Sequence, residues 1–206
     1  MAYNEVMMST QRTDIKDMTL PPQDAPQLVL ISGLAGSGYS TALNVLEDVG
    51  YSAVDNLPLA LVDKLIGIEV ETAGRRLAVS LDGRTSGFDE HGVQGLMRDI
   101  RRRLGGGVKL IFLSAEETVL YRRFNATRRH HPLNKAGDLM AAIRDDWARM
   151  APIEAMADIA IDTSGVSPTQ FRASLLNQLG LNDAYQMPAF ISSFSYRHGT
   201  PEDADM

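Results

Sequence analysis

The chain has 206 residues, of which 44% are hydrophobic, and this length suits one α/β domain with flanking segments. It contains no cysteine, which excludes disulfides, thiolate metal ligands and a cysteine nucleophile. The formal net charge of -6 argues against a generally basic nucleic-acid-binding protein, and with no secretory signal and no membrane-length apolar run we expect a cytoplasmic protein.

The first predicted strand leads into a glycine-rich loop. Residues 1–26 are polar and are predicted to be a disordered lead, followed by a domain at 27–182. An apolar run at 28–31 predicts a buried parallel strand, and an amphipathic helix ends later at Gly50. Between them, the spacing Gly33-x-x-x-x-Gly38-x-Ser40 is typical of a phosphate-binding loop.

We call residues 33–40 the phosphate loop. Its glycines let backbone N–H groups turn toward an anion, and the helix that follows adds partial positive charge. The Ser40 hydroxyl is the candidate Mg²⁺ ligand. Tyr39 stands where the motif has a lysine, and a charge-assisted contact is worth roughly 1.5–3 kcal/mol. We therefore expect a loop that binds phosphate groups, with weak or absent hydrolysis. The predicted nucleotide-binding residues of the loop are Gly33, Leu34, Ala35, Gly36, Ser37, Gly38, Tyr39 and Ser40.

The next two predicted strands, 51–56 and 76–82, carry Asp55 and Asp82 near their ends. The carboxyl ends of parallel strands form the ligand-binding edge of such a sheet. Asp55 and Asp82 are therefore candidate catalytic residues, placed near a substrate or a Mg²⁺-bound water, and the strand at 76–82 resembles a Walker B strand. Alternatively, each aspartate merely begins a turn. In the loop that follows, Arg84 faces either phosphates or solvent.

Two arginine-rich segments follow. The predicted helix at 88–104 ends in four arginines, which indicate an exposed face at a helix C-terminus, with nucleic-acid contact as the alternative. A strand at 108–114 leads to a helix with the most basic stretch of the chain, residues 122–131. This stretch is either an arginine lid that closes over phosphates or a solvated face. The adjacent His130 and His131 do not indicate a metal site.

The remaining pattern completes the fold. A helix at 139–150, a strand at 157–164, and a helix from Ser167 and Pro168 to Gly180 are predicted. Five strands that alternate with helices predict an α/β fold with a doubly wound, parallel five-stranded sheet of the P-loop NTPase or kinase type. Residues 183–206 include an alternating segment at 190–198, which we expect to begin a further, truncated carboxyl-terminal domain.

Several of these segments closely resemble one family. The chain is similar, from about Leu28 to its last residue, to the RapZ/YvcJ family of bacterial P-loop nucleotide-binding proteins, whose best-studied members act as RNase adapters. The resemblance is carried by segments Ser32–Gly38, Ala42–Asp48, Val54–Pro58, Asp82–Arg84, Arg122–Arg123, Thr127–Pro132, Ile161–Ser164, Ser193–Gly199 and Asp203–Asp205.

The resemblance implies ATP and GTP binding with slow hydrolysis at the phosphate loop. It also implies a second nucleotide-contact segment, which maps to Asp82, Gly83, Arg84 and Thr85. In the family, a further carboxyl-terminal domain binds small regulatory RNA and an amino-sugar phosphate and recruits an endoribonuclease. The chain stops at Met206, a few residues into that domain, so the resemblance does not carry the RNA adapter role to it.

The chain departs from the family at Tyr39, and at Gly83 and Thr85, where the family reads valine and asparagine. Three interpretations stay open. The first is a nucleotide-binding domain that is at most a weak ATPase or GTPase. The second is a small-molecule P-loop kinase, and the third is a non-enzymatic regulatory scaffold. The oligomeric state stays open between a monomer and a homo-oligomer.

Overall fold

A computed structural model of the chain describes residues 25–127, 130–134 and 137–181. Within these residues, five parallel strands form one sheet in the order β2-β3-β1-β4-β5, which confirms the predicted doubly wound fold. The strands are β1 (Leu28–Gly33), β2 (Ser52–Val54), β3 (Leu77–Ser80), β4 (Val108–Ser114) and β5 (Ile159–Asp162). The α-helices are α1 (Tyr39–Asp48), α2 (Leu59–Ile66), α3 (Glu90–Leu104), α4 (Glu117–Thr127), α5 (Leu139–Glu154) and α6 (Pro168–Gln178).

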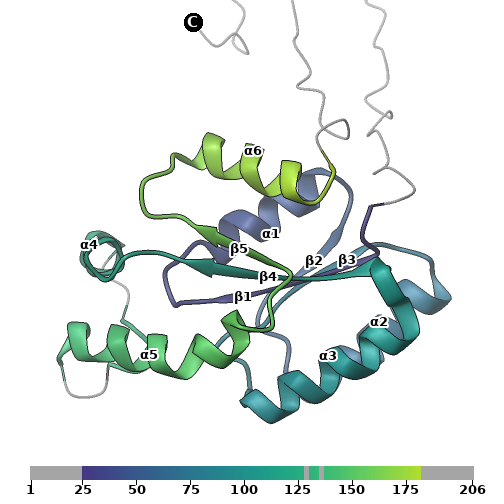
Figure 1. The fold of residues 1–206 in the computed structure, drawn as a ribbon, viewed down its shortest axis with the longest axis horizontal. Helices are drawn as coiled ribbons and strands as arrows, with labels where there is room; N and C mark the ends of the chain where they lie inside the picture. Colours follow the sequence, from purple (N-terminus) through teal and green to yellow (C-terminus); the bar gives the residue numbers. More distant parts are fainter. Residues whose placement is uncertain (1–24, 128–129, 135–136, 182–206) are drawn as a thin grey trace, which may run out of the picture.

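Helices cover the sheet on both faces, as Figure 1 shows: α1 and α6 lie on one face, and α2, α3 and α5 on the other. Successive residues of a strand point to opposite faces, so β1 contributes to two hydrophobic clusters. Leu28 and Leu30 pack into the cluster on the α2, α3 and α5 face, whereas Val29 and Ile31 pack into the cluster under α1 and α6. Every residue of β1 is buried, as expected for a central parallel strand.

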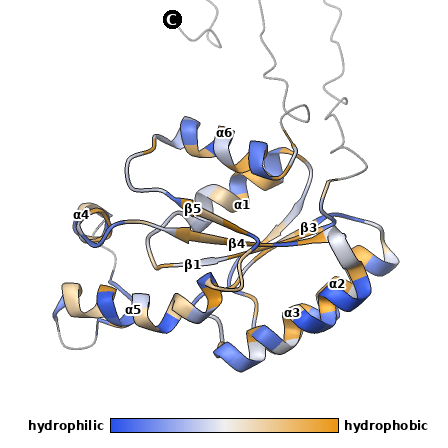
Figure 2. Ribbon diagram, viewed as in Figure 1, coloured by the Kyte–Doolittle hydropathy of each residue, from blue (hydrophilic) through white to orange (hydrophobic). Residues whose placement is uncertain are grey.

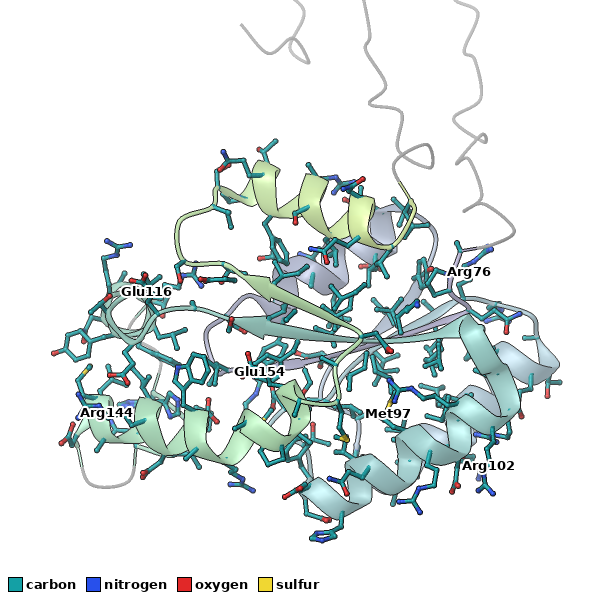
Figure 3. All side chains as sticks on the ribbon, viewed as in Figure 1. Arg76, Met97, Arg102, Glu116, Arg144 and Glu154 are labelled. Atoms are coloured by element: carbon teal, nitrogen blue, oxygen red, sulfur yellow. The ribbon has the colours of Figure 1, made fainter. Side chains whose placement is uncertain are left out.

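The helices are amphipathic. Apolar residues gather on the strands and on the inner faces of the helices, and polar residues lie on the outer faces (Figure 2). In Figure 3, Met97 of α3 points toward the sheet, whereas Arg102 points away from it. The α6 helix begins with a capping box, in which the Ser167 side chain accepts from Gln170 N–H and the Gln170 side chain accepts from Ser167 N–H.

Some elements differ from the predictions at their ends. The α2 helix, which we expect from the sequence to span 59–68, ends at Ile66 and continues as a π-helix over Gly67–Thr72. The basic helix α4 ends at Thr127, so His130 and His131 lie beyond it. The predicted lead up to residue 24, the segment from 183 onward, and Arg128 and Arg129 lie outside the described residues.

The arginines at the end of α3 form ion pairs with neighbouring acids. Arg101 donates to Asp158 at 2.9 Å, and Arg103 pairs with Asp63 of α2. Arg102 pairs with an aspartate one turn earlier in α3. The predicted exposed face is therefore largely charge-balanced. Among the described helices, none is long and apolar enough to cross a membrane.

Candidate functional site

The phosphate loop lies between β1 and α1, at the end of the central strand. Its glycines at 33, 36 and 38 have φ angles of 144°, 84° and 117°, which other residues adopt only with strain. Gly33 is the most restricted, because a Cβ there would lie 2.0 Å from the carbonyl oxygen of Leu113 in β4. The sequence pattern thus reflects a backbone that only glycine can form.

The carbonyl groups of this loop are held by side chains from distant parts of the chain. Arg123 of α4 donates to the Gly36 carbonyl at 3.1 Å, and the Thr163 hydroxyl donates to the Ser37 carbonyl at 2.9 Å. Arg123 also donates to the hydroxyl and carbonyl of Thr163 at 2.9 and 2.6 Å. The loop is therefore clamped to α4 and to the end of β5.

At the start of α1, Gly38 is the N-cap residue and provides no side-chain cap. The first N–H groups of a helix have no acceptor within the helix. Together with the helix dipole, these groups make the first turn of α1 suited to an anion. Ser40 is exposed in this turn.

Tyr39 points inward. Its side chain is only 6% exposed, and its hydroxyl donates to the Gly33 carbonyl at the other end of the loop. Burial raises the pKa of the phenol well above its ordinary value of 10.0, and the carboxylates of Asp82 and Asp146 raise it further. Tyr39 therefore stays neutral and closes the loop by a hydrogen bond, and it does not supply the charge that a lysine would bring.

The strand-end acids come together with Arg84. Asp82 accepts a bidentate contact from the Arg84 guanidinium, at 2.6 Å for the closest pair of atoms. The Arg84 guanidinium also lies 3.7 Å from Asp55, and Asp55 accepts a hydrogen bond from the Ser80 hydroxyl. Thr85 is buried, and its hydroxyl accepts from the Asp82 N–H at 3.2 Å. The structure thus brings the two predicted acids and Arg84 into one cluster.

Two adjoining cavities flank the loop. The first, of about 350 Å³, is lined by the loop, the first turn of α1, Arg84 and Arg123. The second, of about 310 Å³, lies against the start of α6 and shares Gly36, Gly38 and Arg123 with the first. A larger hollow of about 950 Å³ lies between α2 and α3. We place the candidate site at the phosphate loop because the uncapped first turn of α1 and two arginines, Arg84 and Arg123, meet there.

A family comparison agrees with this geometry. Residues 26–183 match the model of the RapZ-like N-terminal domain. The chain belongs to the RapZ-like family. Curated relatives carry the name nucleotide-binding protein: one from Dinoroseobacter shibae is 39% identical over 92% of this chain and 63% of its own length. Another, from Paramagnetospirillum magneticum, is 37% identical over 97% of this chain and 66% of its own length. The chain thus spans about two-thirds of the length of these relatives or slightly less.

Solved structures show the same fold at lower identity. A shikimate kinase from Bacteroides thetaiotaomicron matches with a TM-score of 0.51 and 16% identity, over 75% of this chain and 98% of the kinase. A shikimate kinase from Acinetobacter baumannii, solved with shikimate, also has a TM-score of 0.51 and 16% identity, over 78% of this chain and 93% of its own. At this identity, the likeness supports the P-loop kinase fold alone.

Sequence reasoning missed a buried acid at the phosphate loop of the RapZ-like domain. Asp146 of α5 is 5% exposed, and its carboxylate accepts from the Ala35 N–H in the phosphate loop at 2.8 Å. Its carboxylate also lies 3.6 Å from Nε2 of the buried His131. The sequence signal that could have indicated Asp146 is an acidic residue among the apolar residues of one helix face. The buried residues of that face are Ala142, Ile143, Asp146, Met150 and Ile153.

The basic stretch divides into residues with different environments. Arg123 clamps the loop, and burial lowers its pKa, as does the neighbouring Arg122. Arg122 itself is exposed, and His131 is buried with its ring 4.9 Å from that of Phe124. Arg122 therefore matches the interpretation of this stretch as a solvated face, whereas Arg123 contacts the phosphate loop.

Proposed function

We propose that this RapZ-like domain binds a nucleoside triphosphate, ATP or GTP, at the phosphate loop and hydrolyses it slowly or not at all. The observation that supports this most strongly is the uncapped first turn of α1, which faces a cavity lined also by Arg84 and Arg123. Backbone N–H groups and two guanidinium groups suit a polyphosphate. The names of the relatives, nucleotide-binding protein, agree with the proposal.

The two cavities suit the two ends of a nucleotide. The polyphosphate would occupy the cavity over the first turn of α1. The nucleoside would occupy the adjoining cavity, where Val166, Pro168 and Phe171 provide apolar surface beside Arg123. Aromatic and aliphatic walls with few polar groups are usual for such sites. The geometry supports ATP and GTP equally, because it does not assign the groups that would read the base.

Slow turnover follows from the charges around the loop. Efficient phosphoryl transfer needs positive charge at the transferred phosphoryl group, which a P-loop lysine and Mg²⁺ usually supply. Position 39 carries a neutral, inward-facing phenol instead. The exposed Ser40 hydroxyl fits a Mg²⁺ ion that accompanies a nucleotide. No group of three metal-ligating side chains occurs among the described residues, so the protein itself offers few metal ligands.

A direct test places a negative charge where the phosphates would bind. In Ser40→Asp, the new carboxylate lies in the exposed first turn of α1, where it is favourable to the helix. We expect the variant to stay folded and to lose ATP and GTP binding in calorimetric titrations with Mg²⁺. His91→Asp, an exposed first-turn position of α3, is the matched control and should bind like the wild type. Absence of wild-type binding at millimolar nucleotide would refute the proposal.

A second candidate is phosphoryl transfer to a small molecule. It is favoured by Asp55, whose side chain is 46% exposed at the end of β2 and lies 3.7 Å from Arg84, a residue that lines the cavity at the phosphate loop. A carboxylate in this place is a candidate general base for an acceptor hydroxyl. The test is transfer of labelled phosphate from ATP or GTP to a metabolite pool, compared between wild type and Asp55→Asn. A labelled product that depends on Asp55 would favour the kinase over the weak hydrolase.

The regulatory scaffold is the third candidate. Binding of ATP or GTP would argue against it, and absence of binding would argue for it. A scaffold would fold and bind a partner with no response to ATP or GTP. Small regulatory RNA and an endoribonuclease remain partners implied by the resemblance alone. The arginines of α3 do not strengthen that implication, because Arg101, Arg102 and Arg103 pair with acids.

A further inference from the structure

Both oxygens of the Asp82 carboxylate accept hydrogen bonds from one residue, Arg84. Oδ1 accepts from the Arg84 backbone N–H at 2.7 Å and from Arg84 Nε at 3.1 Å. Oδ2 accepts from Nε at 2.9 Å and from Nη2 at 2.6 Å. Three N–H groups of Arg84 thus engage this carboxylate, which has about four lone-pair sites, and Asp82 is only 4% exposed. Because Arg84 engages both of its oxygens and almost none of its surface is exposed, this carboxylate does not fit the role of a metal ligand.

The backbone around this pair is also fixed. The Thr85 N–H donates to the Asp82 carbonyl at 2.9 Å, and the Asp82 N–H donates to the Thr85 hydroxyl at 3.2 Å. These bonds close a tight turn over residues 82–85. The turn brings the Arg84 guanidinium back onto Asp82, and a bidentate contact fixes the plane of the guanidinium as well as its position.

The held guanidinium lies at the phosphate loop. The Arg84 side chain is 44% exposed and lines the same cavity as Gly36, Gly38 and Ser40. Among the described residues, its Nη1 has no hydrogen-bond acceptor, so donors remain for a ligand. The hydrogen bond to Asp82 is the main cause that raises the pKa of Arg84. Arg84 is thus a permanent positive charge at this cavity, to which the neutral side chain of Tyr39 adds none.

We propose that Asp82 is a positioning residue, which holds Arg84 toward the nucleotide phosphates, and that it is not a metal ligand. Arg84 then provides the point charge that Tyr39 does not. This inference rests on the proposed function, because it assigns roles within the same site. It replaces the interpretation of the strand at 76–82 as a Walker B strand whose aspartate orients Mg²⁺.

The test is a double-mutant cycle measured with and without metal. ATP and GTP affinities would be determined for wild type, Asp82→Asn, Arg84→Gln and the double variant, each in Mg²⁺ and in EDTA. We expect Arg84→Gln to weaken binding by about tenfold or more. The effect of Asp82→Asn should be equal in Mg²⁺ and in EDTA and should differ between the wild-type and Arg84→Gln backgrounds, because it acts through Arg84. Arg84→Lys, which keeps the charge but not the fork, should restore part of the loss.

Arg102→Gln is the matched control. It removes an arginine from an equally local ion pair on α3, and binding should not change. An effect of Asp82→Asn that is present in Mg²⁺, vanishes in EDTA and is independent of residue 84 would overturn the inference while leaving nucleotide binding intact. Failure of the wild type to bind any nucleotide would instead refute the proposed function, and with it the role of Arg84.

A second measurement needs no nucleotide. Mn²⁺ would be titrated into wild type and Asp82→Asn, with water proton relaxation as the readout. We expect both proteins to behave alike at submillimolar Mn²⁺. A wild-type site that Asp82→Asn removes would show that Asp82 binds metal and would overturn its assignment as a positioning residue.

Discussion

The hydroxyl of Tyr39 provides a sharp test of how the phosphate loop is held. Tyr39→Phe removes one oxygen and keeps the ring, which packs with Ala42 and Leu43 of α1 under the loop. Without this hydroxyl, the buried Gly33 carbonyl loses the hydrogen bond that it accepts from Tyr39. An unsatisfied buried acceptor costs about 1–3 kcal/mol. For a domain of this size, that corresponds to a fall in Tm of roughly 2–12 °C.

The measurement is urea unfolding followed by circular dichroism, with thermal unfolding in parallel. Tyr121→Phe is the control, because that side chain is 42% exposed on α4, and its stability should change by less than about 0.5 kcal/mol. Equal stability of the two variants would contradict the role of Tyr39 in closing the loop. Nucleotide affinity should fall in Tyr39→Phe as well, since the loop loses its closure although no group that faces the phosphates is removed.

Three other measurements probe the site and its surroundings. Gly33→Ala should destabilise the protein by at least about 3 kcal/mol in urea unfolding, because its Cβ meets a carbonyl oxygen, whereas Gly95→Ala in the open interior of α3 should stabilise it by about 0.5–1 kcal/mol. Arg123→Met should weaken nucleotide binding by releasing the loop from β5, and Arg122→Met, at an exposed neighbouring position, should bind like the wild type in the same titration. Burial raises the pKa of Tyr51 to about 12, so the folded state holds this proton more tightly than the unfolded state. The stability that depends on this group is fully present below pH 10 and is lost as the pH rises from about 10 to about 12. In alkaline unfolding, the free energy of unfolding of Tyr51→Phe should therefore fall less steeply with pH than that of the wild type.

The sequence predicted the features that depend on local pattern. The apolar run at 28–31 indicated a central strand, because a strand covered on both faces must be apolar on both. The glycine spacing indicated the phosphate loop, because positive φ angles at 33, 36 and 38 admit little else. Ser167 and Pro168 marked the start of α6, since the cap and the fixed φ of proline act within a single turn. The parallel, doubly wound sheet followed from the alternation of strands and helices, and family membership from the motifs.

The tertiary structure decided how the side chains of the site are used. Asp146 reaches Ala35 across 111 positions of sequence, and Arg123 reaches Gly36 across 87, so no local pattern specifies either contact. The sequence placed Tyr39 at the lysine position, and only the packing under α1 shows that its hydroxyl turns back to Gly33. The sequence likewise placed Asp82 at a strand end, but the turn over 82–85 engages its carboxylate with Arg84. Backbone shape is determined by short-range sterics and glycine placement, which the sequence displays directly. The partners of a charged side chain depend instead on which distant elements the folded sheet brings to the same edge.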